Sequence, residues 1–437
     1  MRLFDPDRPF SPRRVPFFYG WLILGAAVVG ILMSLPGQTA GVSVFTDHLI
    51  QATSLDRLQL SGAYFAGTLA SGLLLPFGGR WIDRYGARKT ALVAALALGG
   101  TVFLFGRVDR LTGGPDGAVG STVAVFVLGF FLLRFSGQGM LTMVSRTMLG
   151  RWFDRRRGLV AGVSGVFIAF GFASAPPVLS WLIAGFGWRG AYGVMAGVVV
   201  VTMTCVGYVF YRDTPEACGL RMDGRSPEEE VAGQGKTRAT GRDQTWQTAL
   251  RRLAFWSLTL ALSGQSLIIT GITFHIVDLG AQNGFDEARV VAVFLPMAVM
   301  STSVGLLVGV VADYVPVRAL VLVMMVAQAI GIVGFANFDH SVFHWVGVLA
   351  MGFTNGFFGP LSTLALPRYF GRKHLGTISG VQMMCMVVGS AIGPAVFALA
   401  TQSSGSYDLA LHGALAFPAL AVVLTLLARH PQAEAVA

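Results

Sequence analysis

The chain has 437 residues, of which 54% are hydrophobic and 12% are charged, and its net charge is +10. Soluble proteins carry about 25% charged residues, so this composition excludes a soluble globular protein. Apolar stretches of roughly 20 residues also exclude a β-barrel, whose strands run to only about 10 residues. The fold class predicted is an all-α membrane protein that crosses the bilayer many times. The positive charge is attributed to cytoplasmic loops, and nucleic acid is not an expected partner.

The apolar segments predict twelve transmembrane helices in two six-helix halves. A cytoplasmic N-terminal tail (1–16) precedes the first half (17–211), and a charged cytoplasmic linker (212–247) joins it to the second half (248–428) and a short cytoplasmic tail (429–437). The spans are expected near residues 17–46, 57–82, 87–108, 118–148, 158–184, 189–211, 248–277, 287–312, 317–337, 342–366, 374–402 and 407–428.

The distribution of Lys and Arg predicts the orientation. With both termini inside, only Arg57, Arg107, Arg110, Arg189 and Arg289 fall in outer segments, and one further arginine lies within a span. All other Lys and Arg lie in cytoplasmic segments, as expected for proteins of the inner (cytoplasmic) membrane. The sequence therefore predicts a multi-pass inner-membrane protein with cytoplasmic termini.

The two halves repeat the same loop patterns. GRWIDRYGAR (79–88) after span 2 and GVVADYVPVR (309–318) after span 8 share the spacing G-x3-D-x4-R. RWFDRRRGLVAG (151–162) and RYFGRKHLGTISG (368–380) precede spans 5 and 11 and share an aromatic–basic start followed by G-x3-G. Such a repeat predicts two related bundles with a substrate site near the membrane midplane.

One cation, Arg134, lies in the fourth span inside a run of uncharged residues (117–145). A charged side chain at that depth is costly, so it is expected to face the protein interior and to have a partner. Three roles remain open: an anchor for a substrate carboxylate, a structural tie to neighbouring helices, or part of a proton relay. Gln138 lies one helical turn further and is expected on the same face.

Other polar side chains at membrane depth are candidates for lining a cavity. Pro36 and Gly37 predict a break in span 1, which would expose backbone groups. His275 is the best buried candidate for titration near neutral pH. For each candidate a hydrogen bond between helices is the competing interpretation. The candidates are Gln38, Thr39, Tyr64, Thr68, Gln265, His275, Thr354 and Asn355.

The loop GGRWIDRYGARK (78–89) resembles the signature of the major facilitator superfamily between spans 2 and 3. The matching residues are Gly79, Asp83, Arg84, Gly86, Arg88 and Lys89. Tyr19-Gly20-Trp21, RWFDRRRGLVAG and PEACGLRMDG are similar to features of the bacterial relatives of monocarboxylate and oxalate–formate transporters. The resemblance implies a secondary transporter in which Asp83, with Arg88 nearby, engages the N-terminus of span 11 and latches the cytoplasmic side. A carboxylate at a helix N-terminus is favoured by the helix dipole.

The sequence departs from that pattern where the substrate would be held. Span 8 (VVAVFLPMAVMSTSVGLLVGVVA) lacks the arginine that monocarboxylate transporters of this kind carry, and span 11 lacks the lysine of oxalate carriers. The function predicted is transport of a small organic anion, a monocarboxylate in the first instance, by alternating access. The alternatives are an exporter of amphiphilic or drug-like compounds and, less favoured, a membrane sensor.

No catalytic residues, metal site or cofactor are predicted, and the chain is not expected to be an enzyme. Cys205, Cys218 and Cys385 show no metal-binding or disulfide spacing. MMCM (383–386) raises a copper carrier, but consecutive helical residues point around the axis and cannot converge on one ion. Apart from the lipid bilayer and a small-molecule substrate no partner is expected, and the protein is predicted to be a monomer.

Overall fold

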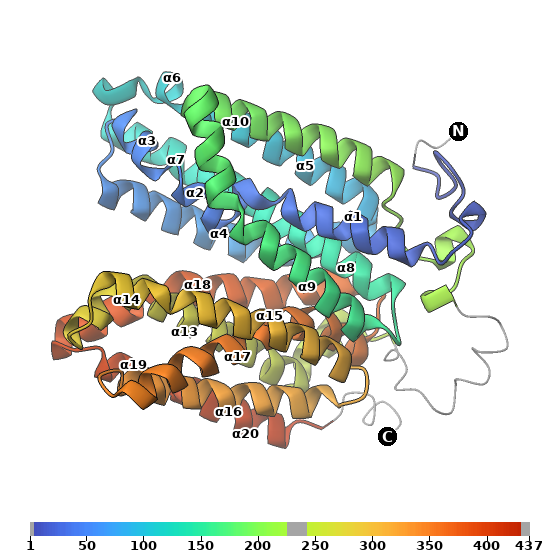
Figure 1. Ribbon diagram of the computed structural model, residues 1–437. Helices are drawn as coiled ribbons and strands as arrows, with labels where there is room; N and C mark the ends of the chain where they lie inside the picture. The colour runs from blue at the N-terminus through green and yellow to red at the C-terminus, as the bar shows by residue number, and fades with distance from the viewer. Residues whose placement is uncertain (1–3, 225–242, 430–437) are drawn as a thin grey trace. The chain divides into compact units, whose positions relative to one another are not determined.

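The computed structural model describes residues 4–224 and 243–429 (Figure 1). These residues form helices joined by turns and contain no strand. Within them, nine helical stretches are long and apolar enough to cross a membrane, and the shorter helix α1 (Gly20–Leu32) is apolar as well. The all-α class is confirmed, whereas the count of twelve spans stays a prediction. Much of the predicted linker lies outside the described residues.

The helices follow the order of the predicted spans. Those that begin before residue 225 are α1, α2 (Thr39–Ser43), α3 (Thr46–Gln51), α4 (Arg57–Tyr85), α5 (Ala87–Phe105), α6 (Val108–Thr112), α7 (Val119–Leu133), the π-helix η4 (Arg134–Leu141), α8 (Thr142–Trp152), α9 (Arg157–Ala173) and α10 (Ala175–Val209). Those that begin after residue 242 are α12 (Trp246–Arg251), α13 (Leu253–Gln282), α14 (Glu287–Ala292), α15 (Phe294–Val311), α16 (Val317–Ala336), α17 (Ser341–Phe370), α18 (Leu375–Ser404), α19 (Asp408–Ala414) and α20 (Ala416–Leu427).

The described residues form two compact units. The first comprises residues 4–154, 167–224 and 379–383, and the second comprises residues 155–166, 243–378 and 384–429. In the first unit α4 packs on α7, α5 on α10, and α1 on α8; α5 and α10 lie side by side in Figure 1. In the second, α17 packs against both α15 and α16, and α13 packs on α20.

Two helix breaks follow directly from the sequence. The predicted interruption of span 1 is confirmed: α1 ends at Leu32, and Leu35–Gly37 form a single 3-10 turn before α2. Proline at the second position of that turn lacks an N–H and cannot continue the helix. The second break is Gly187 within α10, whose φ of 67° is outside the helical region. It falls between the predicted spans 5 and 6, and glycine adopts such a φ without steric cost.

The segment between the N-terminus and α1 is held against the end of the first unit by two buried arginines. Arg212 donates to the carbonyls of Pro6, Arg8 and Phe10 at 2.7, 2.8 and 3.3 Å. Arg88 donates to the carbonyls of Asp5 and Arg8 at 3.1 and 2.9 Å, and also to the Tyr208 carbonyl. These bonds satisfy buried guanidinium donors with backbone acceptors instead of carboxylates.

Candidate functional site

The fourth predicted span changes its helical form at the arginine. α7 ends at Leu133, and Arg134–Leu141 continue as a π-helix before α8 begins. π-helical turns are rare and are found frequently at functional sites. Gly137 in this segment faces the 3-10 turn of the first span, so that a Cβ on Gly137 would lie 2.9 Å from the Gly37 Cα. Two glycines therefore bring the break in span 1 against the backbone of span 4.

Arg134 lies at this contact and is 4% exposed. Its Nη1 donates to the Gly37 carbonyl at 3.2 Å and to the Thr39 hydroxyl at 3.3 Å. The guanidinium carbon lies 5.3 Å from the ring centroid of Tyr64, within cation–π range. Among the described residues no carboxylate pairs with Arg134, and its Nε is buried without a hydrogen-bond partner. Arg134 therefore has the partners that its burial predicts, but they are uncharged: the Gly37 carbonyl, the Thr39 hydroxyl and the Tyr64 ring.

Two of the predicted residues of the first unit, Thr39 and Tyr64, contact the arginine, and the other three form no hydrogen bond with its side chain. Thr39 and Tyr64 hydroxyls lie 3.0 Å apart, and Thr39 is also a partner of Arg134. Gln38 Nε2 donates to the Ser34 hydroxyl at 2.9 Å. Thr68 is buried with no hydrogen-bond partner for its hydroxyl. Gln138 is half-buried, and no side-chain hydrogen bond forms between it and the other described residues.

The candidates in the second unit do not form one cluster. Gln265 and Gln328 are both fully buried, and Gln328 Nε2 donates to Gln265 Oε1 at 2.8 Å. The Thr354 hydroxyl donates to the Ala350 carbonyl of its own helix at 2.8 Å. Asn355, the residue after Thr354 on α17, is exposed. The part of these residues in substrate binding stays a prediction.

His275 contacts polar groups on two other segments. One ring nitrogen, Nε2, lies 2.9 Å from the Pro394 carbonyl of α18, and Nδ1 lies 3.1 Å from the Tyr407 hydroxyl. Tyr407 in turn lies 2.6 Å from the Asp278 carboxylate. Both nitrogens of the imidazole therefore have partners within the protein. To bind a substrate through this ring, His275 would have to give up one of these contacts.

The predicted latch residues divide into three groups. Asp83 Oδ1 accepts from Arg151 Nη2 at 2.7 Å, an ion pair in which both side chains are largely buried. Arg88 donates to carbonyls of the N-terminal segment. The cation of Arg84 lies over the ring of Tyr85, and that of Lys89 lies over the ring of Phe4. Gly79 is buried within α4, and Gly86 ends that helix. The contact of Asp83 with span 11 stays a prediction.

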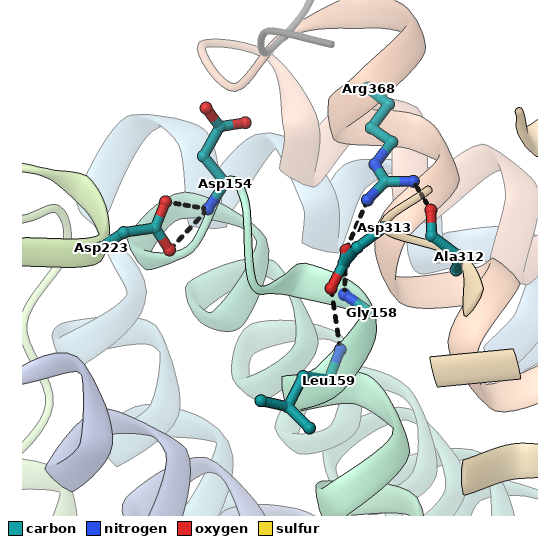
Figure 2. Close-up of polar contacts among 7 residues, drawn as sticks. All are labelled: Asp154, Gly158, Leu159, Asp223, Ala312, Asp313 and Arg368. Atoms are coloured by element: carbon teal, nitrogen blue, oxygen red, sulfur yellow. Dashed lines mark hydrogen bonds and ion pairs between the residues drawn. The ribbon is translucent and has the colours of Figure 1, made fainter. Parts of the chain in front are cut away.

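The same loop of the second half places a carboxylate on a helix N-terminus (Figure 2). Asp313 accepts from the backbone N–H groups of Gly158 and Leu159, at 3.0 and 3.4 Å, at the start of α9. Arg368 Nη2 donates to the same carboxylate at 2.7 Å, and its Nη1 donates to the Ala312 carbonyl. Burial raises the pKa of Asp313, while the Gly158 amide and Arg368 act against that rise. A helix dipole and a guanidinium thus stabilise one anion.

A second carboxylate in Figure 2 binds the turn before α9. Both oxygens of Asp223 lie 3.2 Å from the backbone N–H of Asp154. Asp223 adopts a left-handed backbone conformation, with φ of 55°. This contact connects the PEACGLRMDG segment after span 6 to the end of α8, so one part of the sequence resemblance corresponds to a specific contact.

Comparison with known proteins decides the family. A sequence profile described as Major Facilitator Superfamily matches residues 22–394 and 298–436. The chain belongs to the major facilitator superfamily. It is 26% identical over 384 residues, 84% of both chains, to a protein named probable sulfoacetate transporter SauU from Cupriavidus necator. It is 24% identical to monocarboxylate transporter 13 of Rattus norvegicus, in an alignment that covers 83% of this chain and 87% of that one.

Solved structures share the fold of this superfamily member. The proton:xylose symporter XylE aligns with a TM-score of 0.69 and 13% identity, over 96% of this chain and 99% of that one. The human organic anion transporter MFSD10 aligns with a TM-score of 0.65 and 16% identity, over 94% and 100%. The predicted family, and its relation to monocarboxylate transporters, are confirmed.

Sequence reasoning missed three features of this superfamily member. The π-helix at Arg134 has no apolar periodicity that would mark it in a continuous hydrophobic run. The pairing of Asp313 with Arg368 could have been found, because both residues stand in the repeated loop patterns. The pairing of His275 with Tyr407 joins positions 132 residues apart and has no sequence signal.

Proposed function

We propose that the protein is a secondary transporter that moves a small organic anion bearing a carboxylate across the cytoplasmic membrane by alternating access. Arg134 anchors the anion. The twelve predicted spans form the two halves that alternate, and both termini are cytoplasmic. The protein works without a cofactor and as a monomer.

The observation that carries the proposal is the set of donors that Arg134 leaves unused. A guanidinium has five N–H donors. The two described hydrogen bonds both leave from Nη1, so Nε and Nη2 form no bond with the described residues. These two nitrogens make one edge of the planar group, and a carboxylate can accept from both at once. The bonds of Nη1 hold the side chain in place, and the hydrogens of Nε and Nη2 have no acceptor among the described residues.

The names of the relatives support the same class of substrate. One is named for sulfoacetate and others for monocarboxylates, so each name implies a small anion with a carboxylate. Arg134 supplies a single cation, which matches one carboxylate. Thr39 and Tyr64, whose hydroxyls adjoin the guanidinium, would contact the remainder of a small ligand.

The test compares two substitutions of Arg134 in purified protein. A counterflow screen in proteoliposomes with mono- and dicarboxylates, sulfoacetate and hydrophobic cations first identifies the anion that exchanges best. Arg134→Gln should then bind that anion roughly 30- to several-thousand-fold more weakly, because losing a buried charge partner costs about 2–5 kcal/mol. Arg134→Lys keeps the charge without the planar fork and should retain a weakened fraction. Binding is read as ligand-induced thermal stabilisation.

Arg57→Gln is the matched control, because it removes an exposed arginine that forms a surface ion pair with Asp47. Such a pair contributes about 0–1 kcal/mol, and this variant should bind the anion as the unsubstituted protein does. Equal binding by Arg134→Gln would refute the anchor and leave the arginine a structural role. Exchange of hydrophobic cations without any carboxylate would instead favour the exporter.

A further inference from the structure

Three titratable side chains of the second unit are joined in a chain of hydrogen bonds. His275 and Asp278 lie one turn apart on α13, and Tyr407 lies in the turn before α19. Tyr407 is 5% exposed, His275 is half-buried and Asp278 is exposed. The chain runs from the Pro394 carbonyl through His275 and Tyr407 to Asp278, over distances of 2.9, 3.1 and 2.6 Å.

The direction of these bonds fixes the number of protons in the set. The Pro394 carbonyl can only accept, so His275 Nε2 must carry a hydrogen. The remaining two contacts, from Nδ1 to the Tyr407 oxygen and from that oxygen to Asp278, need one hydrogen each. Tyr407 supplies one of them. The other belongs to His275 Nδ1 or to Asp278, so a neutral imidazole beside an ionised aspartate leaves one contact without a hydrogen.

We propose that His275, Tyr407 and Asp278 form a proton-binding site that holds one exchangeable proton and, when occupied, fastens α13 to α18 and to the turn before α19. With the proton bound, an imidazolium faces a carboxylate through one hydroxyl, and the set has no net charge. After the proton leaves, two acceptors face each other across one contact, and that contact opens. Asp278, the exposed member, gives the proton access to water.

Neighbouring groups do not supply the missing hydrogen. The Thr401 hydroxyl lies near Tyr407, but its hydrogen goes to the Phe397 carbonyl at 2.9 Å. Gln282 Nε2 reaches Asp278 Oδ2 at 3.5 Å, and it leaves the His275–Tyr407 contact unchanged. His412 on α19 uses Nδ1 for its own Asp408 carbonyl.

The other described titratable groups on the surrounding helices bond elsewhere. On the α14 side the Arg289 guanidinium lies 4.4 Å from the Phe285 ring centroid, and Asp286 accepts from the Arg289 backbone N–H. His344 of α17 packs against Phe338, with ring centroids 4.4 Å apart. Asp408 accepts from the Ser406 hydroxyl. Described residues of α20 include no charged side chain, and the only titratable group within α18 is Cys385.

Hydrogen exchange measured by mass spectrometry tests the site without any substrate, so its outcome is independent of the proposed function. The unsubstituted protein is compared at about pH 5.5 and about pH 8, a range that brackets ordinary histidine titration, with intrinsic exchange rates corrected for pH. Peptides covering residues 395–410 should open about tenfold more at the higher pH, the effect of losing one charge-assisted hydrogen bond.

Two histidine variants make the test specific. His275→Gln presents one amide donor and one acceptor at every pH, so the pH-dependent part of the opening should disappear. His412→Gln is the matched control on α19 and should keep it. Tyr407→Phe should open these peptides at both pH values, because the hydroxyl that joins the two titrating groups is gone.

Nitrogen-15 NMR of histidine-labelled protein in nanodiscs gives a second readout that does not depend on stability. The signals missing from His275→Gln identify this ring, and at about pH 5.5 both of its nitrogens should carry hydrogen, as the chain of hydrogen bonds through Tyr407 to Asp278 requires. Exchange in residues 395–410 that is equal at both pH values, or a His275 ring whose Nδ1 carries no hydrogen at about pH 5.5, would overturn the proposal.

Discussion

Buried polar side chains in this protein differ in whether their hydrogen bonds are complete. Arg134 has N–H donors without a hydrogen-bond partner among the described residues, as expected of a side chain that binds a ligand. Gln265 and Gln328 also have unused groups, but both are fully buried. Their single bond leaves the Gln265 Nε2 and the Gln328 Oε1 without partners. A pair of this kind contributes little to stability, yet breaking it on one side is costly.

This pair gives a prediction that separates a structural role from a role in binding. Gln265→Leu should lower the free energy of unfolding by about 1–3 kcal/mol, because the Gln328 amide then has no partner. The double variant Gln265→Leu/Gln328→Leu should recover most of the loss, since both partners become apolar. Thermal unfolding in detergent measures both. A double variant that is stable but no longer exchanges the anion would show that this glutamine pair has a role in transport beyond stability.

At the scale of elements, the site depends on the backbone contact between the 3-10 turn of span 1 and the π-helix of span 4. A Cβ on Gly37 would lie 2.5 Å from the Leu133 carbonyl, and one on Gly137 would lie 2.9 Å from the Gly37 Cα. Neither element can move away without displacing Arg134, because the Gly37 carbonyl is one of its two acceptors.

Gly37→Ala should therefore destabilise the protein by about 1–3 kcal/mol through overpacking and weaken anion binding at the same time. Gly120→Ala on α7 is the control, because a Cβ there meets nothing within 4 Å. Alanine in an open helical position is favoured over glycine by about 0.5–1 kcal/mol, so the control should be neutral or stabilised. Melting temperature and ligand-induced stabilisation report the two effects. Unchanged binding in a destabilised Gly37→Ala protein would contradict the link between this contact and Arg134.

The elements show which parts of the fold the sequence could predict. Pro36 and Gly37 mark the break in span 1 because both residues have strong backbone preferences, and Gly187 falls between two predicted spans for the same reason. The π-helix lies in a uniformly apolar run, where neither composition nor periodicity distinguishes it from an α-helix. The sequence singles out His275 as a candidate because it is a histidine at membrane depth, whereas its contacts with Tyr407 and Pro394 depend on packing between distant segments.

At the scale of the whole molecule, the corresponding loops of the sequence repeat both form an aspartate–arginine ion pair, but the aspartates differ in their other contacts. Asp83 in the first half pairs with Arg151, and Asp313 in the second pairs with Arg368. Of these two aspartates, Asp313 accepts from the N–H groups of a helix N-terminus, whereas the family resemblance points to Asp83. The repeat of the loop patterns is visible in the sequence because spacing alone defines it, and the two related halves that it implies stay a prediction. The sequence could not distinguish the two aspartates, since their contacts depend on the conformation adopted.

Asp313→Asn should loosen the start of α9. The variant loses the charge that both the helix dipole and Arg368 stabilise, so a cysteine at buried Ser164 should react about tenfold faster with a thiol reagent. In the unsubstituted protein the ionised carboxylate makes these bonds. Because burial raises the pKa of Asp313 above its value in an opened contact, proton uptake favours the closed contact, and opening of α9 should decrease as the pH falls toward the usual range near 4. The asparagine variant should lack this pH dependence.

Asp286→Asn is the control for that experiment, because Asp286 also accepts from a backbone N–H at a helix start but lies beside α14. It should leave the reactivity at Ser164 unchanged. The same measurement with Asp83→Asn tests the latch that the family resemblance implies. Equal labelling in Asp313→Asn and the unsubstituted protein would mean that the contact does not restrain α9.

The N-terminal segment has a consequence for how the protein is made. Residues 5–10 leave the ribosome before Arg212, which binds three of their carbonyls and follows about 200 residues later. At translation rates of about 5–20 residues per second, that delay is on the order of ten seconds or more. In the predicted topology, this segment stays on the cytoplasmic side until the predicted sixth span has been inserted, and its docking on Arg212 follows that insertion.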